Sequence, residues 1–309
     1  MNHHLVIGNG PVGSGVTERL VEQGLPVTVL TRSGSGIDHP LVTRVAADAA
    51  DADALTKAAD GAAAIFNCAN PPYHQWETAW PPIHRAIMTA AGRTGAVVTM
   101  MDNLYGFGAG STMPMRENDP LRATGTKGGT RARMATELLA AHQAGTLRAT
   151  LARASDFFGP GVRDAALGER AIPKIIAGKK VALLGRIDQP HSMSYMPDVT
   201  RTLVTIALDP TAWGHAWHVP NAPAVTQGEF VRILAKAAGT NSTASTVPKF
   251  ALTAIGVVNP TMRELKETWY QFAEPFVTDS ALTEGAFGLT ATSLEEAARA
   301  TIAWWRAQG

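Results

Sequence analysis

The residues with the clearest chemistry form a glycine-rich stretch near the start of the chain. They are Gly8, Asn9, Gly10, Pro11, Val12 and Gly13. A G-x-G-x-x-G spacing between an apolar strand and a helix is typical of a dinucleotide-binding turn, in which the glycines permit a tight turn and a close approach to the pyrophosphate. The free N–H groups and the dipole of the following helix favour phosphate charge. The alternative is an ordinary tight turn between a strand and a helix.

The end of the second predicted strand indicates which dinucleotide binds. An NAD site commonly places an Asp or Glu about 20 residues past the glycines, whereas an NADP site uses a nearby Arg. Here the strand ends in Thr31, Arg32 and Ser33, without a carboxylate. We therefore expect NADP(H) to be preferred, with NAD(H) as the alternative cofactor. In the competing interpretation, Arg32 is an ordinary solvated charge.

Four side chains are candidates for catalysis. Asp102 ends a predicted strand as a candidate acid or base. Lys127 is a candidate only through a family resemblance, which implies that it polarises a carbonyl group or binds the nicotinamide ribose. His191 suits proton transfer near pH 7, and Tyr195 adds a hydroxyl donor. The alternatives are a solvated Lys127, a turn role for Asp102, a hydrogen-bonded structural His191 and a packed Tyr195.

Aromatic residues after the fourth predicted strand are candidates for substrate binding. Tyr73 and Trp76 lie in the run PPYHQW, where their rings can stack on an apolar or aromatic small molecule. Met101, at the end of the fifth predicted strand, is a third candidate contact. Packing inside the protein is the alternative for Trp76. We predict no metal site, because His3 and His4 adjoin on one strand and point to opposite faces.

The elements that position these residues alternate along the first half of the chain. Short apolar runs such as 27–30 and 97–101 are separated by Ala-rich helical stretches. This order predicts an α/β fold with a doubly wound parallel sheet, the Rossmann fold. We expect a dinucleotide-binding domain over residues 1–160, with a return element at about 190–210. The remainder, mostly 161–309, is expected to form a smaller mixed substrate lobe.

Composition limits the partners and the location. The chain has 309 residues, a formal net charge of +1 and one cysteine, Cys68. Scattered Lys and Arg argue against nucleic acid, and no segment reaches the ~20 continuous apolar residues of a membrane span. A lone cysteine favours a reducing compartment, so we expect a cytoplasmic protein with a small-molecule substrate. The helix predicted at 132–143 is a candidate homodimer contact, with packing on the sheet as the alternative.

The succession of motifs resembles the extended short-chain dehydrogenase/reductase superfamily, in its NAD-dependent epimerase/dehydratase group. The motifs are the glycine turn, Asp48, and the stretches 67–70, 103–106, 152–161, 191–198 and 289–304. The resemblance implies the following cofactor contacts: Asp48 and Ala49 near the adenine, Ala69 and Asn70 near the ribose and pyrophosphate with Cys68 beside them, and Ser155 near the nicotinamide. Alternatively, Asp48 is a helix cap and Cys68 a small buried apolar residue.

The chain departs from this superfamily at its proton relay. The superfamily uses a Ser or Thr after the fifth strand and a Tyr-x-x-x-Lys on the next helix. Here Met101 stands at the Ser/Thr position, and Gly128 and Ala132 stand at the Tyr and Lys positions. No tyrosine lies between Tyr105 and Tyr195.

Three functions remain open after this loss. The first, and the one we expect, is an atypical NADP(H)-dependent oxidoreductase that acts on a carbonyl, alcohol or imine of a small molecule. Hydride transfer belongs to the cofactor, and positioning contributes much of the rate. The second is a lyase, isomerase or epimerase that uses bound nicotinamide without net oxidation. The third is a non-catalytic NADP-binding regulator, because the fold alone does not fix function.

Overall fold

The computed structural model describes residues 3–247 and 264–308. The described chain divides into two compact units. Within the described ranges, unit 1 comprises the segments Met1–Gly106, Leu121–Ala154 and Val199–Trp217. Unit 2 comprises the described residues of the segments Phe107–Pro120, Ser155–Asp198 and His218–Gly309. Each unit has its own hydrophobic core.

Unit 1 is built on a seven-stranded sheet with the order β11-β6-β5-β4-β1-β2-β3. The strands are β1 (His3–Ile7), β2 (Val27–Thr31), β3 (Val42–Ala46), β4 (Ala62–Asn67), β5 (Val97–Asn103), β6 (Ala149–Ala154) and β11 (Ala216–His218). The pairs from β3 through β6 are parallel. In this order the sequence of strands runs outward in both directions from the β1–β4 pair. Ligands bind at such a switch point in doubly wound sheets. The predicted Rossmann fold is confirmed.

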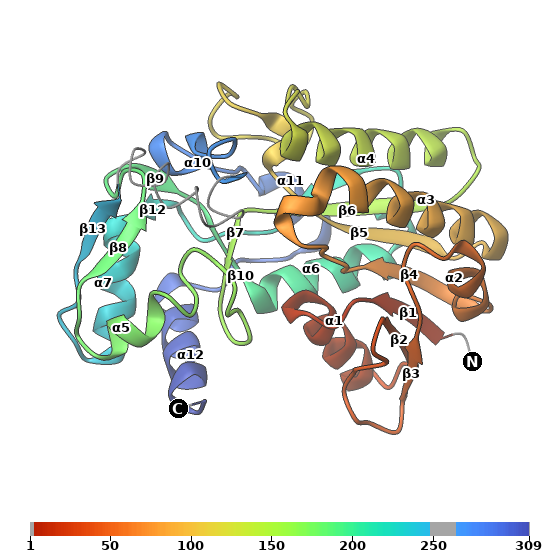
Figure 1. Cartoon of the computed structure of the whole chain (residues 1–309), viewed down its shortest axis with the longest axis horizontal. Coiled ribbons are helices and arrows are strands. Elements are labelled where there is room, and N and C mark those ends of the chain that lie inside the picture. Colours follow the sequence, from red (N-terminus) through yellow and green to blue (C-terminus); the bar gives the residue numbers. More distant parts are fainter. Residues whose placement is uncertain (1–2, 248–263, 309) are drawn as a thin grey trace. The chain divides into compact units, whose positions relative to one another are not determined.

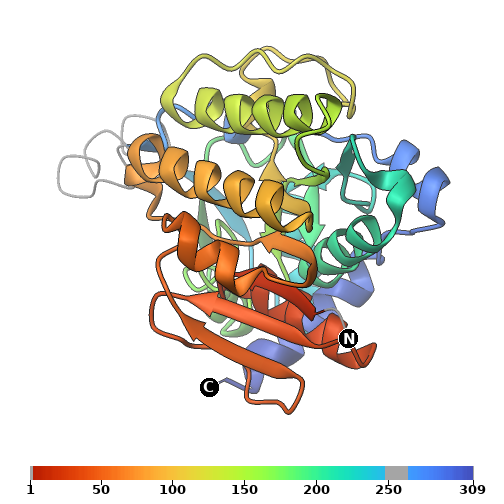
Figure 2. The same ribbon diagram turned by 90° about the vertical axis from the view of Figure 1, so that its right-hand side faces the viewer.

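Helices cover both faces of this sheet (Figure 1). They are α1 (Pro11–Glu22), α2 (Ala52–Ala58), α3 (Trp76–Thr94), α4 (Thr126–Gln143) and α6 (Met196–Leu208), with the 3-10 turns η1 (Tyr73–Gln75), η2 (Tyr105–Phe107) and η3 (Pro210–Ala212). Helices α2, α3 and α4 lie on one face, and α1 and α6 lie on the other. Figure 2 shows α3 and α4 side by side, as in Figure 1.

Local sequence explains where several helices begin and end. The carboxylate of Asp51 accepts hydrogen bonds from the N–H groups of Asp53 and Ala54 and so starts α2. Helix α3 stops at Gly95, whose left-handed backbone, with a φ of 73°, suits glycine. The buried core between α3, α4 and the sheet is apolar and includes Trp80 and Met100.

Unit 2 is a mixed lobe with short strands. Its strands are β7 (Asp156–Phe158), β8 (Val181–Leu184), β9 (Pro190–His191), β10 (Met193–Tyr195), β12 (Val225–Thr226) and β13 (Ala244–Val247). Its helices are α5 (Ile172–Ile176), α7 (Gln227–Ala238), α10 (Tyr270–Ala273), α11 (Ala281–Phe287) and α12 (Leu294–Arg306). Helix α12 packs on α7 and α5 around a core that includes Phe230 and Ile302. The expected mixed C-terminal lobe is therefore present.

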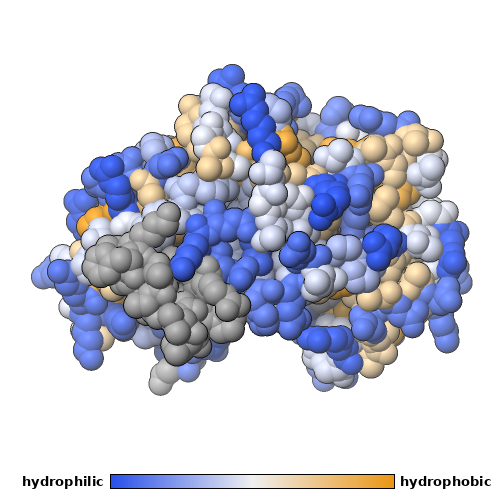
Figure 3. All heavy atoms as spheres, turned by 45° about the horizontal axis from the view of Figure 1, so that its top comes forward, coloured by the Kyte–Doolittle hydropathy of each residue, from blue (hydrophilic) through white to orange (hydrophobic). Residues whose placement is uncertain are grey.

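The surface view shows hydrophilic residues over much of the visible face, with apolar residues in small groups (Figure 3). Among the described residues, Leu208 and Leu282 are the large apolar side chains that are strongly exposed. No helix in the described ranges combines the length and apolar character needed to cross a membrane.

Candidate functional site

The glycine turn between β1 and α1 has the geometry of a close backbone cradle. Gly8 has a φ of 96°, and a Cβ atom there would lie 2.8 Å from the main-chain oxygen of Cys68. A Cβ atom on Gly13 would lie 2.0 Å from the oxygen of Gly8, so side chains are excluded at both positions. A Cβ atom on Gly10 would instead face open space. The turn thus packs tightly on its protein side and leaves room at Gly10 for an approaching group.

The first turn of α1 has the character of an anion site. Gly10 is its N-cap residue and contributes no side-chain hydrogen bond, and Pro11 occupies the first helical position. Without a capping side chain, the early N–H groups and the dipole are left for a ligand or solvent. The hydroxyl of Ser14 donates to the side-chain oxygen of Asn9 at 3.1 Å and fixes that side chain in the turn. These residues fit a dinucleotide pyrophosphate.

The end of β4 forms the other wall of this turn. The N–H of Cys68 donates to the oxygen of Ile7 at 3.0 Å, which joins β4 to β1 beside the glycines. Cys68 is buried, and its burial raises the pKa of the thiol to about 12. Ala69 is half-buried and Asn70 is exposed. Cys68 therefore acts as a small packed side chain, and Asn70 is accessible to a ligand.

Of the residues predicted to bind the adenosine part of the cofactor, some are exposed and one is hydrogen-bonded within the protein. Arg32 and Ser33 are exposed just after β2, whereas the hydroxyl of Thr31 donates to the main-chain oxygen of Ser35 at 3.1 Å. Arg32 thus presents a charge at the place where an NADP site needs one.

The next loop of this region is ordered by a carboxylate. Asp48 accepts a hydrogen bond from the N–H of Ala50 at 2.9 Å, and Ala49 packs half-buried on the core. Helix α2 is capped by Asp51 and not by Asp48. Asp48 therefore shapes the loop after β3.

Helix α4 carries the altered relay position. Gly128 is buried, and a Cβ atom there would lie 2.6 Å from the main-chain oxygen of Tyr105 and 2.6 Å from the Cβ of Ala123. Lys127 is also buried, and its Nζ lies 5.1 Å from the centroid of the Tyr73 ring. The helix thus offers an amine beside a tyrosine that comes from η1, a different element.

Tyr73 belongs to an aromatic cluster next to β4 and β5. Its ring centroid lies 5.0 Å from that of Trp76 and 6.4 Å from that of Tyr105. Trp76 is buried and donates from Nε1 to the oxygen of Pro71, so it packs in the core. Tyr73 is half-buried and is the member of the predicted substrate pair with exposed surface.

Asp102 lies in a buried ion cluster at the end of β5. Its Oδ1 accepts from Arg131 Nε at 2.8 Å, and its Oδ2 accepts from Arg153 Nε at 3.3 Å. Arg131 also donates to the main-chain oxygen of Met101 at 2.6 Å. Both carboxylate oxygens are engaged, so the geometry favours a structural role for Asp102 over the acid or base role predicted from sequence. Met101 is half-buried.

His84 lies beside this ion cluster. It lines a small cavity between α3 and α4 with Arg133 and Glu137, and its Nε2 lies 3.6 Å from a Glu137 oxygen. Burial, followed by the positive charge of Arg131, lowers the pKa of His84 to about 4. The imidazole is therefore neutral near pH 7.

The segment of unit 2 that starts at Ser155, just after β6, belongs to a chain of hydrogen-bonded polar groups. The N–H of Ser155 donates to the hydroxyl of Ser194 at 2.9 Å, and Ser194 donates to the side-chain oxygen of Asn221 at 2.8 Å. The amide of Asn221 donates to the hydroxyl of Thr278 at 2.9 Å. The Ser155 hydroxyl is buried and has no hydrogen-bond partner among the described residues. A polar group in this state suits contact with a ligand.

His191 lies in a bonded network on β9. Its Nε2 is 3.0 Å from a carboxylate oxygen of Asp156, and its Nδ1 is 3.1 Å from the main-chain oxygen of Gln271. The ring is 2% exposed and Asp156 is 24% exposed. Tyr195 packs against Phe158 with ring centroids 5.4 Å apart. The two predicted catalytic residues thus have different surroundings, and Tyr195 fits a packing role.

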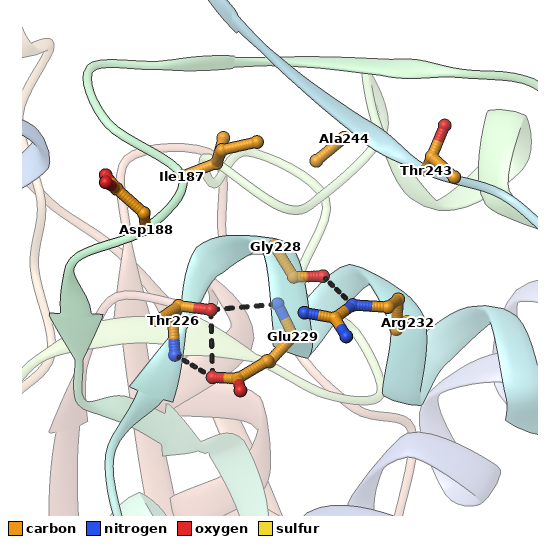
Figure 4. Close-up of a pocket in the computed structure, with 8 residues that line it drawn as sticks. All are labelled: Ile187, Asp188, Thr226, Gly228, Glu229, Arg232, Thr243 and Ala244. Atoms are coloured by element: carbon orange, nitrogen blue, oxygen red, sulfur yellow. Dashed lines mark hydrogen bonds between the residues drawn. The ribbon is translucent and has the colours of Figure 1, made fainter.

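A separate pocket of about 420 Å³ lies in unit 2, between the first turns of α7, residues 187–188 of the loop after β8, and the start of β13 (Figure 4). Its polar side chains are largely bonded within the protein. Thr226 and Glu229 form a reciprocal capping box at the start of α7, and Arg232 donates to the oxygen of Gly228. The described residues contain no group of three or more His, Cys, Asp or Glu side chains that could hold a metal ion.

Sequence reasoning missed Asp156 and Arg131. Arg131 carries no local signal, because its partner Asp102 is 29 residues away in the sequence. Asp156 had one usable signal, which is a carboxylate two residues beyond the end of a buried parallel strand. The structure brings Lys127 and Tyr73 together within unit 1, and Ser155, Asp156 and His191 within unit 2.

The sheet order and the glycine turn define a doubly wound α/β protein of the Rossmann type. The model of the NAD dependent epimerase/dehydratase family matches residues 4–219, and the chain belongs to this family. The predicted resemblance is confirmed. A search of curated proteins gave no significant match.

Solved structures share the fold across the chain at low identity. MoeE5, in complex with UDP-glucuronic acid and NAD, is 20% identical over all of both chains, with a TM-score of 0.82. The UDP-glucose 4-epimerase of Thermotoga maritima, with UDP-glucose, is 17% identical over 100% of this chain and 99% of that one, with a TM-score of 0.80. WbmH of Bordetella bronchiseptica, with NAD⁺, is 19% identical over 99% of each chain, with a TM-score of 0.76.

Proposed function

We propose that this protein is an enzyme that binds a nicotinamide dinucleotide on the Gly8–Gly13 turn and transfers hydride at a carbinol or carbonyl carbon of a small molecule. The single observation that carries the proposal is the turn itself, tight at Gly8 and Gly13 and open at Gly10, at the uncapped start of α1. Family membership supports the same chemistry. When bound, the cofactor supplies the hydride, and the chain supplies binding, orientation and proton handling.

The first candidate reaction is an epimerase, dehydratase or related isomerase reaction, in which the bound nicotinamide is regenerated in each cycle. The family supports it, as do neighbours whose structures contain NAD or UDP-sugars. The substrate class would be a nucleotide-linked sugar.

The second candidate is a net NADP(H)-dependent reductase or dehydrogenase acting on a carbonyl, alcohol or imine. Arg32, exposed after β2 where a carboxylate would mark an NAD site, favours NADP(H). The half-buried Tyr73 offers a ring face for an apolar or aromatic substrate. This candidate retains the cofactor preference expected from the sequence.

Lys127 is proposed to orient the cofactor or substrate from α4. Its amine is buried beside the Tyr73 ring, where electrostatic interactions are stronger than in water. Arg131, one helical turn further on, ties α4 to Asp102 and fixes the position of Lys127.

One set of assays separates the candidates. The protein is incubated with NAD⁺, NADP⁺ or NADPH and either UDP- and dTDP-sugars or a panel of aldehydes, ketones and imines. Sugar products by NMR without net change in absorbance at 340 nm indicate the first reaction, and stoichiometric NADPH oxidation indicates the second. Tight cofactor binding without turnover on either panel would indicate a non-catalytic NADP-binding regulator. Absence of dinucleotide binding would overturn the proposal.

We propose a homodimer that uses the outer surface of α4, which sedimentation velocity would test. A cytoplasmic location stays a proposal, tested by fractionation of cells that express the tagged protein.

A further inference from the structure

Two acceptor oxygens flank the ring of His191. The carboxylate of Asp156 lies 3.0 Å from Nε2, and the main-chain oxygen of Gln271 lies 3.1 Å from Nδ1. A carbonyl oxygen only accepts hydrogen bonds, so Nδ1 must carry a proton. The contact at Nε2 then requires a second proton, either on Nε2 or on the Asp156 carboxyl. The pair therefore holds one proton more than a neutral imidazole and a free carboxylate.

The surroundings shield the imidazole from water and leave Asp156 as the partly exposed member of the pair. His191 is 2% exposed, and its ring lies near Phe272 and Phe276, with centroids 6.2 Å and 5.3 Å away. Asp156 is the only charged group among the described hydrogen bonds and ring contacts of His191. Water reaches the imidazole poorly, whereas Asp156 retains 24% exposure. The proton can thus leave or enter by way of Asp156.

The position of Asp156 suits contact with a substrate. β6 ends at Ala154, opposite Asn103 of β5, and Asp156 follows two residues later. The carboxyl ends of the strands are where ligands bind in open α/β sheets. The neighbouring Ser155 has a buried hydroxyl without a partner in the described chain. A proton-bearing carboxyl and an unpaired hydroxyl therefore adjoin at this strand end.

We propose that Asp156 is the acid and base of the reaction and that His191 is its positioning residue, which together replace the missing tyrosine relay. This inference rests on the proposed function. As a substrate carbonyl carbon gains a hydride, its C=O π bond becomes a C–O bond, and the oxygen takes the proton from Asp156. The pair is left as a carboxylate and an imidazole with a proton on Nδ1 alone, and solvent returns the proton. Oxidation of a carbinol runs the same transfer in reverse.

The proton count is tested without cofactor or substrate. In ¹⁵N-histidine NMR spectra of the whole protein near pH 7, the pair should hold two protons in total. These are seen either as two protonated ring nitrogens, or as one together with a carboxyl proton on Asp156 in the infrared spectrum. Asp156→Asn should leave a neutral ring protonated at Nδ1 alone. A wild-type ring with one proton and an ionised Asp156 would overturn the proposal, whether or not the protein binds NADPH.

The catalytic arm uses the substrate identified by the assay panels. Asp156→Asn should lower kcat by about 100-fold or more, the range of general acid–base catalysis, with the Kd for NADPH within about twofold of wild type. His191→Gln should displace the pH optimum of kcat, which a purely structural role would not do. Asp188→Asn is the matched control, since Asp188 is an exposed carboxylate paired with Arg186. Turnover of Asp156→Asn near the wild-type rate would overturn the proposal and show that the Asp156–His191 pair has a structural role only.

Folding is checked separately for each variant. Asp156→Glu keeps the carboxyl and should recover part of the rate lost in Asp156→Asn. If Asp156→Asn does not fold, the rate of Asp156→Glu and the pH profile of His191→Gln decide the proposal. Failure of the wild-type protein to bind either NAD(H) or NADP(H) refutes the proposed function, whereas the NMR proton count refutes the role of the pair alone.

Discussion

The main-chain oxygen of Tyr105 lies only 2.6 Å from the position that a Cβ atom on Gly128 would occupy. The backbone of the Tyr105 turn is packed against the start of α4. The fold therefore leaves no room for a tyrosine side chain at position 128. Restoring a tyrosine at this position would require the helix or the turn to move.

Gly128→Ala is therefore expected to destabilise the protein by about 1–3 kcal/mol, the usual cost of overpacking. Gly128→Tyr should lower stability further and restore no activity. Gly92→Ala is the control, because its Cβ would meet its nearest neighbour at 3.6 Å and alanine should stabilise α3 by up to about 1 kcal/mol. Chemical denaturation measures all three, and equal stability of Gly128→Ala and wild type would contradict the packing argument.

Arg32→Ala is expected to raise the Kd for NADPH by about tenfold or more, a loss of about 1.4 kcal/mol, and to leave the Kd for NADH nearly unchanged. The reason is that the 2′-phosphate distinguishes the two cofactors and Arg32 is the exposed charge at the end of β2. Calorimetric titration gives both constants. Arg93→Ala removes an arginine at the far end of α3 as the control, and equal NADPH binding by Arg32→Ala and wild type would refute the assignment.

Asp102→Ala should destabilise the protein by about 3–5 kcal/mol, because two buried guanidinium groups would lose their shared carboxylate. The exposed pair between Asp53 and Arg93 provides the comparison. Asp53→Ala should change stability by no more than about 1 kcal/mol, as is usual for surface pairs. A loss at Asp102 as small as that at Asp53 would show that Arg131 and Arg153 need no buried counter-ion.

His84 is expected to make the protein acid-sensitive. Its pKa is about 4 in the folded protein and 6.5 ordinarily, so between these values the unfolded chain binds more protons and stability falls as the pH drops. The loss should approach about 3 kcal/mol at pH 4, since each pKa unit is worth about 1.36 kcal/mol.

His84→Gln should remove this part of the pH dependence of the unfolding free energy, measured between pH 7 and pH 4. His74→Gln, at an exposed position on η1, should leave the dependence unchanged. An identical pH slope in His84→Gln and wild type would contradict the burial argument.

Cys68 is expected to resist thiol reagents in the folded protein, because burial raises its pKa to about 12 and the thiolate is the reactive form. A chromogenic disulfide reagent at pH 8 should label the native chain slowly and the guanidinium-unfolded chain to one equivalent. Leu282→Cys, at an exposed position, adds a thiol that should react at once. Rapid labelling of the native wild type would show that the end of β4 opens.

The sequence predicted the parts of the site that depend on short spacing. The glycine turn, the strand before it and the helix after it lie within one continuous segment, so residue type and distance along the chain were sufficient. The alternation of apolar strands with helices likewise predicted the doubly wound sheet. The loss of the tyrosine relay was also visible, because that motif occupies one turn of one helix.

The tertiary structure decided which charges and protons meet. The sequence predicted Asp102 as a candidate acid or base. Folding places its carboxylate between Arg131 and Arg153, which are 29 and 51 residues away in the sequence. His191 is paired with Asp156 over 35 residues. Such pairings are set by the register and packing of distant elements, and no local pattern encodes them. The sequence by itself therefore determined a glycine turn and a fold, and only the folded chain determined which charged groups lie together.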